Sequence, residues 1–391
     1  YVSGKQLIQR RPILSSLSQI FRVWRKKARH SRPDFLDVKD IMSASNITCM
    51  GEDLIFITCQ PRSGSTMLQR ILGTHSEVHT ISEPWLMLHP LYALREEGIQ
   101  TEYGAGLAHT ALESVLDELP NGRQDYIEGV RKIYQTLYRK LLEPTDATLF
   151  LDKTPRYYLI LPELKEVFPE ARYILLVRNP LSVFTSILRT WVKNNWLAVG
   201  NFRQDLLDAP EQIRDANRDG EEGVILTRYE DLVQHPESEV PKVCDHLQID
   251  FEPTMIQYGG SEKKEWTFGD PESVYEHESP QTSSLEKWTQ PKNAQEWRLL
   301  WEYAQLLGPH VFDAFGYPFH DCIQKLERVR PSDRDLRYTV SLEWLLENKS
   351  SAKKMWTRHG IGMMDAMREG GGKGLVSYTL ERVKSQVSQI T

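Results

Sequence analysis

Short apolar runs alternate with stretches of helical character through most of this chain, and that alternation limits its fold more than any other feature. The runs at 54–59, 148–151, 173–177 and 224–226 have the length and composition of buried strands. Helical patterns occupy 66–72, 126–142, 162–168, 180–193 and 241–247. Strands that alternate with helices predict an α/β fold, with a P-loop-like parallel sheet flanked by helices. Ligands of such sheets bind beyond the carboxyl ends of the strands.

Three zones follow from this pattern. Residues 1–50 are a basic amphipathic lead-in, residues 51–320 hold the alternating body, and residues 321–391 form a helical C-terminal extension interrupted by Gly370-Gly371-Gly372. The 391 residues are 40% hydrophobic and 26% charged, which is ordinary for a globular protein with a core of its own.

Charge is distributed unevenly along the chain. Residues 1–32 carry nine Lys and Arg and no acidic residue, whereas the whole chain has a net charge of −6, so the rest sums to −15. An acidic body argues against a nucleic-acid partner. Within the lead-in, apolar residues from Ile13 to Trp24 recur at helical spacing, which indicates a basic helix within 10–30. It either docks on a membrane surface or partner, or packs on its own domain.

The four cysteines, Cys49, Cys59, Cys244 and Cys322, have neither metal-ligand spacing nor the density of a disulfide framework. A reduced, cytoplasmic setting fits them best. No apolar run approaches the roughly 18 residues that span a bilayer. The sequence starts at Tyr1 rather than at Met, so the question of a targeting segment stays open.

The first predicted strand runs into Gln60-Pro61-Arg62-Ser63-Gly64-Ser65-Thr66 and then into a helix. A strand, a tight loop of small residues and a helix N-terminus form an anion cradle, because backbone N–H groups and the helix dipole converge there. Ser63, Ser65 and Thr66 add hydroxyl donors and Arg62 a guanidinium fork. An ATP or GTP P-loop would have lysine where Ser65 follows Gly64, so the loop lacks the lysine of that motif.

A second anion site is predicted after the strand at 173–177. Arg178 stands at the strand end, Pro180 suits a helix start, and Ser182 and Ser186 follow at one and two helical turns. Arg178 and Ser186 together could hold a second phosphate, whereas an isolated arginine would form a surface ion pair. Two anion sites at separate strand ends indicate a nucleotide with phosphates at two positions.

With these residues in place, the chain resembles the sulfotransferases that use 3′-phosphoadenosine 5′-phosphosulfate (PAPS). The loop Arg62–Thr66 resembles the 5′-phosphosulfate loop of that family, and Arg178 with Ser186 resembles its 3′-phosphate site. Tyr229, in Arg228-Tyr229-Glu230-Asp231, resembles a family tyrosine near the nucleotide. The resemblance covers about 51–320 and implies PAPS as donor, PAP as product, no metal, and an acceptor that carries a hydroxyl group.

The resemblance extends to a later segment and to one branch of the family. The stretch from Phe268-Gly269-Asp270-Pro271 to Glu286-Lys287-Trp288 resembles the variable loop of the family, which closes over the nucleotide. In this variable segment, Lys287 would be the basic contact. Ser273, Ser279 and Ser283 are equal candidates for a serine contact there. The arginine in the first loop is closer to tyrosylprotein and bacterial sulfotransferases than to the cytosolic small-molecule branch, which has lysine in that loop and a histidine base.

Catalytic roles follow from that branch. Glu83 lies 21 positions after Arg62, as a glutamate does in tyrosylprotein sulfotransferases, which makes Glu83 the candidate general base. Lys153, in Asp152-Lys153-Thr154-Pro155 after the run 148–151, would stabilise the leaving oxygen, with Arg62 as a second cation at the sulfonate. A plain loop glutamate and a surface lysine are the ordinary alternatives.

Two other functions remain in view, a kinase-like phosphoryl-transfer enzyme and a non-catalytic PAP-binding module. The acceptor stays open among small alcohols and phenols, carrier-tethered natural products, sugars and protein tyrosine. Segments 85–125 and 190–220 are expected to shape its pocket, with Trp191, Trp196 and Phe202 as an aromatic wall.

Overall fold

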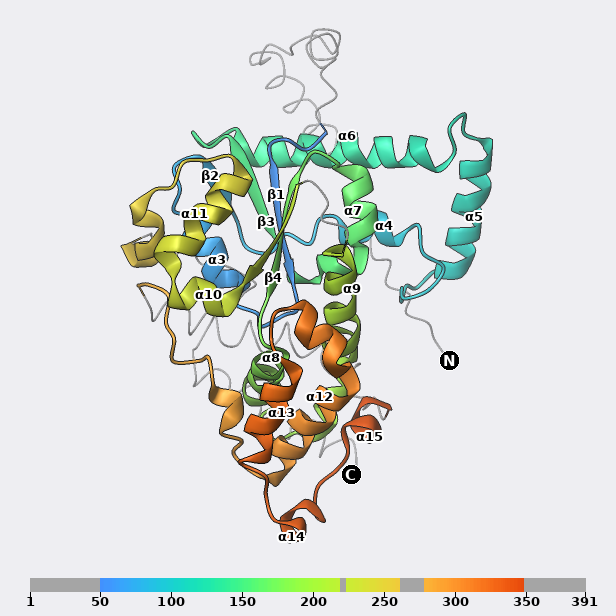
Figure 1. Ribbon diagram of the computed structural model, residues 1–391. Helices are drawn as coiled ribbons and strands as arrows, with labels where there is room; N and C mark the ends of the chain where they lie inside the picture. The colour runs from blue at the N-terminus through green and yellow to red at the C-terminus, as the bar shows by residue number, and fades with distance from the viewer. Residues whose placement is uncertain (1–49, 219–222, 261–277, 348–391) are drawn as a thin grey trace, which may run out of the picture. The chain divides into compact units, whose positions relative to one another are not determined.

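The computed structural model describes residues 50–218, 223–260 and 278–347 (Figure 1). Several sequence predictions fall outside these ranges: the lead-in helix within 10–30, the glycines 370–372 with the helical segment after them, the start of the variable loop at 268–271, and Ser273.

A five-stranded parallel sheet forms the centre of the described chain, in the order β2-β3-β1-β4-β5. The predicted α/β fold with a parallel sheet is thereby confirmed. The strands are β1 (Leu54–Cys59), β2 (Val78–Thr80), β3 (Leu149–Lys153), β4 (Arg172–Val177) and β5 (Val224–Arg228).

Helices cover both faces of this sheet, which explains why its strands are continuous apolar runs. Alternate residues of β1 show the division: Leu54 and Phe56 enter one core, while Ile55 and Ile57 enter the other. The second core lies under helices α3 (Ser65–Leu72), α10 (Tyr229–Gln234) and α11 (Pro236–Leu247). Figure 1 shows these three helices on the same side of the sheet.

The first core is larger and is covered by more elements. Those that follow a strand closely are η1 (Pro155–Ile160), α7 (Leu161–Val167), α8 (Pro180–Ile187) and η2 (Leu188–Val192). The others before residue 220 are α4 (Leu88–Tyr92), α6 (Arg123–Leu142), η3 (Trp196–Phe202), η4 (Gln204–Asp208) and α9 (Ala209–Ala216). The later elements are η6 (Lys287–Thr289), α12 (Ala294–Ala314), α13 (Phe319–Glu327), α14 (Asp333–Leu336) and α15 (Leu342–Glu347). Helix α5 (Ala105–Glu118) buries no residue, and η5 (Pro253–Gly260) adds Met255 and Tyr258 to the second core.

Three predicted boundaries were wrong. The strand expected at 148–151 runs on to Lys153, because parallel pairing with β1 continues to the partners Ile57 and Lys153. The helix expected over 180–193 keeps α-helical geometry only to Ile187 and then widens into the π-helical turn η2. The helix expected at 241–247 begins at Pro236, which occupies its first turn.

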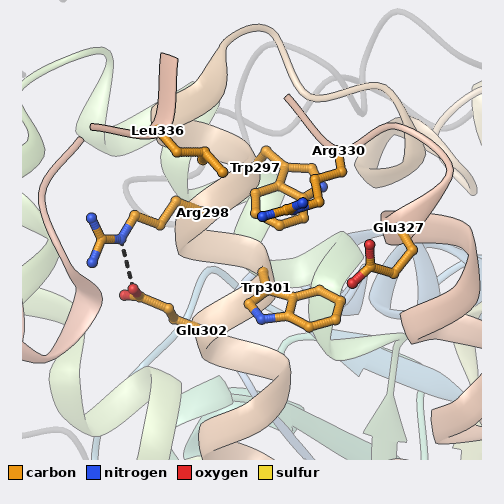
Figure 2. Close-up of a pocket in the computed structure, with 7 residues that line it drawn as sticks. All are labelled: Trp297, Arg298, Trp301, Glu302, Glu327, Arg330 and Leu336. Atoms are coloured by element: carbon orange, nitrogen blue, oxygen red, sulfur yellow. Dashed lines mark hydrogen bonds and ion pairs between the residues drawn. The ribbon is translucent and has the colours of Figure 1, made fainter. Parts of the chain in front are cut away.

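Elements after residue 314 add to the first core through Cys322, Leu326, Leu342, Leu345 and Leu346. Figure 2 shows a pocket over α12, α13 and α14, where Trp297 and Trp301 stack 5.5 Å apart at an interplanar angle of 12°. None of its lining residues is a predicted site residue. Within the described ranges, no helix combines the length and the apolar character needed to cross a membrane.

Candidate nucleotide and sulfuryl-transfer site

Three neighbouring strands deliver the predicted residues to one edge of the sheet. In the order β3-β1-β4, the strand ends carry Lys153, the loop that begins at Gln60, and Arg178. Strand ends of a parallel sheet point to the same edge, so residues more than a hundred positions apart become neighbours.

The loop after β1 leads directly into α3, as predicted. Gly64 is the N-cap of α3 with φ 93° and ψ 17°, a left-handed conformation that favours glycine. A Cβ on Gly64 would lie 2.3 Å from Cδ2 of the Tyr229 ring, so this close approach also requires glycine. The Ser63 hydroxyl is buried without a hydrogen-bond partner among residues 50–218, 223–260 and 278–347. A helix N-terminus beside such a hydroxyl is suited to bind an anion.

Arg62 connects the two predicted anion sites. Its Nε donates to Oγ of Ser186 over 3.1 Å, and its carbonyl oxygen accepts from Nη1 of Arg178 over 3.1 Å. Its guanidinium also lies 5.5 Å from the ring centroid of Trp191. The Arg62 side chain thus extends toward Ser186 on α8.

Arg178 is 8% exposed and is fixed by contacts from three segments. Its Nη2 donates to the Ser284 carbonyl over 3.1 Å, and its Cζ lies 4.3 Å from the centroid of the Tyr229 ring. Its Nε has no hydrogen-bond partner in the described part of the chain. An orphaned guanidinium N–H in a buried setting indicates room for an anionic ligand.

Ser284 was missed by the sequence reasoning, which considered three other serines. Its Oγ lies 3.0 Å from the Tyr229 hydroxyl, so it joins the variable segment to the residues around Arg178. Ser182 donates to the next carbonyl, that of Leu285, over 3.1 Å. The only sequence signal was the polar run Thr282-Ser283-Ser284, in which no position stands out.

Lys287 begins η6 and is exposed, and no hydrogen bond joins its ammonium to Arg178 or Tyr229 among the described residues. Its carbonyl accepts from Arg189 Nη2 over 3.2 Å, which ties this segment to the end of α8 and η2. Ser283 is exposed and Ser279 is half-buried. Neither makes a contact with the residues around Arg178 of the kind that Ser284 makes.

Glu83 and Lys153 form an ion pair at the end of β3. Nζ of Lys153 donates to Oε1 of Glu83 over 2.7 Å, and the side chains are 0% and 12% exposed. Lys153 is therefore not a surface lysine. Nε1 of Trp85 donates to the other Glu83 oxygen over 3.1 Å. A carboxylate and an ammonium held together at the sheet edge can exchange a proton with a substrate and stabilise developing charge.

Two further buried groups lie beside this pair. The Asp152 carboxylate accepts hydrogen bonds from Tyr138, Tyr157 and Thr154, at 2.7, 2.8 and 2.8 Å. Burial raises the pKa of Asp152 to about 6, although these hydrogen bonds lower it. Burial also raises the pKa of the Cys59 thiol to about 12, so Cys59 supplies no thiolate nucleophile at neutral pH. The three hydrogen bonds to Asp152 thus hold the end of β3 in place.

The predicted aromatic residues gather in the segment after α8. Trp191 and Phe202 stack with ring centroids 5.1 Å apart and an interplanar angle of 24°. Trp196 is half-buried and packs against the first core. Because Trp191 also lies beside Arg62, this aromatic pair adjoins the first loop.

Comparison with known proteins identifies the class to which this site belongs. The sequence model of the sulfotransferase family matches residues 53–253, a range that includes β1, the loop after it, Glu83, Lys153, Arg178 and Tyr229. The chain belongs to the sulfotransferase family. The predicted membership in that family is thereby confirmed.

Individual relatives agree with this assignment. Nodulation protein NoeE of Sinorhizobium fredii is 28% identical over 289 residues, which are 68% of this chain and 66% of NoeE. Protein-tyrosine sulfotransferase A of Caenorhabditis elegans is 25% identical over 218 residues, which are 52% of each chain. A putative protein-tyrosine sulfotransferase of Caenorhabditis briggsae is 24% identical over 53% of this chain and 69% of its own length. The chain therefore spans between about half and two thirds of these relatives.

Solved structures with similarity to the chain are also sulfotransferases. A sulfotransferase domain from the curacin biosynthetic pathway has 24% identity and a TM-score of 0.46, over 67% of this chain and 97% of that domain. A sulfotransferase domain from a Synechococcus olefin synthase has 24% identity and a TM-score of 0.45, over 67% and 93%.

Proposed function

We propose that this protein transfers a sulfuryl group from PAPS to an acceptor hydroxyl and releases PAP. The observation that carries the proposal is that two adjoining anion cradles meet a buried lysine–glutamate pair at the ends of three neighbouring strands.

The donor would lie along the loop after β1 and across to α8. The amides at the start of α3, with Ser63, Gly64, Ser65 and Thr66, would hold the 5′-phosphosulfate. The Ser63 hydroxyl fits this role because no residue in the described part of the chain occupies its hydrogen-bonding capacity.

The other phosphate would lie between β4 and α8. Arg178 and Ser186 would bind the 3′-phosphate, for which the orphaned Arg178 Nε provides a donor. The Tyr229 ring, already stacked on Arg178, would lie near the nucleotide. Lys287 would approach from the variable segment as a further cation.

The reaction is an in-line displacement at sulfur. A new bond forms between the acceptor oxygen and sulfur, while the bond from sulfur to the bridging oxygen of the 5′-phosphate breaks and its electrons leave with PAP. The acceptor proton passes to the Glu83 carboxylate, so charge and atoms balance. Lys153 stabilises the negative charge on the leaving oxygen, and Arg62 provides a second cation. With these cations in place, the chemistry as proposed needs no metal.

The environment of Lys153 supports its role. The described residues give Nζ one hydrogen-bond partner, Glu83, although an ammonium has three N–H donors. Two donors of a fully buried cation therefore remain available to a substrate oxygen. A purely structural ion pair would be the alternative, since buried pairs often stabilise little.

The two competing functions fit less well. A kinase-like enzyme would place lysine after Gly64 to reach the phosphates of ATP, and Ser65 stands there. A non-catalytic PAP-binding module would not need the Glu83–Lys153 pair at the centre of its site.

The acceptor is a hydroxyl compound among small alcohols and phenols, carrier-tethered natural products, sugars and protein tyrosine. The names of two relatives state that they act on protein tyrosine. Segments 85–125 and 190–220 would shape the pocket, with the stacked Trp191 and Phe202 as an apolar wall beside Arg62.

We further propose the domain limits 1–50, 51–320 and 321–391, a cytoplasmic location, no nucleic-acid partner, and docking of segment 10–30 on a membrane surface or partner. These proposals rest on composition and charge alone.

The experiment uses sulfur-labelled PAPS with a naphthol, a methyl glycoside, a tyrosine peptide and a carrier-bound hydroxyacyl group as acceptors. We expect label transfer by the wild-type chain to at least one acceptor, and none by Arg62→Ala, Lys153→Ala or Glu83→Gln. Glu83→Gln should still bind PAP. Wild-type rates in Glu83→Gln would refute the assignment of the base.

A further inference from the structure

Trp85, two residues after Glu83, has a backbone conformation that a bulky residue rarely adopts. Its φ is 55°, in the left-handed region, where a side chain with a Cβ costs about 1–2 kcal/mol. Such conformations persist where surrounding contacts hold them in place, and they cluster at functional sites. The contacts of the indole ring must therefore stabilise this conformation.

Among the described residues, the indole N–H of Trp85 is one of two donors to the Glu83 carboxylate. It donates to Oε2 over 3.1 Å, while Lys153 Nζ donates to Oε1 over 2.7 Å. One donor comes from the loop after β2 and the other from the end of β3. Because each oxygen has its own donor, the plane of the carboxylate is defined, and each oxygen keeps a free lone pair.

The indole ring is held in turn by Arg156, which lies on η1. The Arg156 Cζ lies 5.5 Å from the centroid of the Trp85 ring. Its Nε and Nη2 donate to the two Asp205 oxygens over 2.9 and 2.7 Å, a bidentate pair that fixes the guanidinium plane.

Asp205 is a rigid anchor for this arrangement. It is 3% exposed, and its Oδ1 also accepts from the Tyr158 hydroxyl over 2.8 Å. Burial and the neighbouring Asp205 carboxylate raise the pKa of Tyr158, so its hydroxyl stays protonated and donates. The order of contacts is therefore Asp205, Arg156, Trp85 and Glu83.

We propose that Trp85 is a positioning residue for Glu83, and that the Arg156–Asp205 pair holds Trp85 in place for this purpose. The inference rests on the proposed role of Glu83 as the base. Without the indole N–H, Lys153 alone would hold the carboxylate, which would then rotate about its terminal bond. Misplacement of a catalytic group by about 1 Å lowers rates by about a hundredfold. The loss should appear in the transfer rate, because Trp85 contacts Glu83 and Arg156, and neither is a predicted nucleotide-binding residue.

Trp85→Phe tests the N–H separately from the ring, because phenylalanine keeps an aromatic face for Arg156. We expect kcat to fall about ten- to hundredfold with the fastest acceptor of the labelled screen. The acceptor KM and the Kd of PAP should change less than about twofold. Trp301→Phe on α12 is the matched control, since Trp301 stacks on Trp297 in a pocket whose lining residues include no predicted site residue.

A second measurement reads the contact without any turnover. In nitrogen-labelled protein, the indole N–H resonance of Trp85, assigned by its loss in Trp85→Phe, should move in Glu83→Gln, because a neutral amide replaces a charged acceptor. The Trp301 resonance should stay in place. An unmoved Trp85 resonance, or an unchanged kcat in Trp85→Phe, overturns the inference. A wild-type chain that transfers no label while the resonance moves overturns the proposed function instead.

Discussion

Replacing Gly64 with alanine is the perturbation whose effect can be worked out most fully from the structure. The new Cβ would lie 2.3 and 2.5 Å from Cδ2 and Cε2 of Tyr229, where contacts between carbon atoms need about 3.5 Å. Overpacking of this kind costs about 1–3 kcal/mol. The φ of 93° adds about 1–2 kcal/mol for a residue with a Cβ. Gly64→Ala should therefore lower the free energy of unfolding by about 2–5 kcal/mol.

The same change should damage nucleotide binding, because Tyr229 must move. Its ring stacks on Arg178 and its hydroxyl bonds to Ser284, so displacement disturbs the proposed 3′-phosphate site. We expect the Kd of PAP to rise at least about tenfold, which corresponds to a loss of about 1.4 kcal/mol in binding free energy.

Urea unfolding and calorimetric titration with PAP measure both effects. Gly129→Ala in α6 is the matched control, since its Cβ would meet nothing within 4 Å, and it should stabilise the protein by about 0.5–1 kcal/mol. In the double variant Gly64→Ala with Tyr229→Ala, the new Cβ no longer clashes with a ring. The part of the lost unfolding free energy that comes from the clash should return, whereas the part from backbone strain should not. The reasoning fails if Gly64→Ala matches Gly129→Ala in both stability and PAP affinity.

Three shorter predictions follow from other contacts. Burial raises the pKa of Asp152 to about 6, above its usual value of 3.8. The folded protein therefore binds this proton more tightly than the unfolded chain does, which stabilises the fold at pH 4, and this contribution is lost by pH 7. The stability difference between wild type and Asp152→Asn should fall by about 2 kcal/mol over that interval in urea melts, and a constant difference would contradict this. Arg178→Lys should weaken PAP binding at least about tenfold, because lysine lacks the planar fork; unchanged calorimetry would contradict the 3′-phosphate role. Ser284→Ala should weaken PAP binding severalfold and Ser283→Ala should not, by the same assay, since only Ser284 bonds to Tyr229.

The sheet could be predicted from sequence because its strands are buried on both faces. Runs such as 54–59 and 173–177 are continuously apolar and end in punctuating residues, so four of the five strands were found. The strand β2 (Val78–Thr80) has three residues, of which His79 and Thr80 are polar, and carries no comparable signal. Helix α12 contains Gly308-Pro309, a dipeptide that ordinarily marks a loop.

The site could be predicted as a set of residues but not as an arrangement. Glu83 and Lys153 are 70 positions apart, and they meet because β2, which precedes Glu83, pairs in parallel with β3. Pairing of β3 with β1 extends β3 to Lys153, which is completely buried. Sequence patterns give strand existence more reliably than strand ends, so the burial of this lysine could not be foreseen.

Other features of the site depend on tertiary contacts alone. Ser284 is one of several serines in its segment, and only its position beside Tyr229 distinguishes it. The left-handed conformation of Trp85 has no sequence signature, since glycine is the residue expected there. The direction of the Arg62 side chain, toward Ser186, likewise depends on where α8 lies relative to the loop after β1.

The central claim is that the edge of this sheet binds a nucleotide with phosphates at both the 3′ and 5′ positions. Calorimetric titration of the wild-type chain with PAP tests it most directly, beside titrations with ATP and magnesium and with adenosine 5′-phosphate. The account predicts saturable binding of PAP that is at least about tenfold tighter than either comparison nucleotide and that is lost in Arg178→Ala. Tighter binding of ATP with magnesium than of PAP, or PAP binding that Arg178→Ala leaves unchanged, would contradict the account.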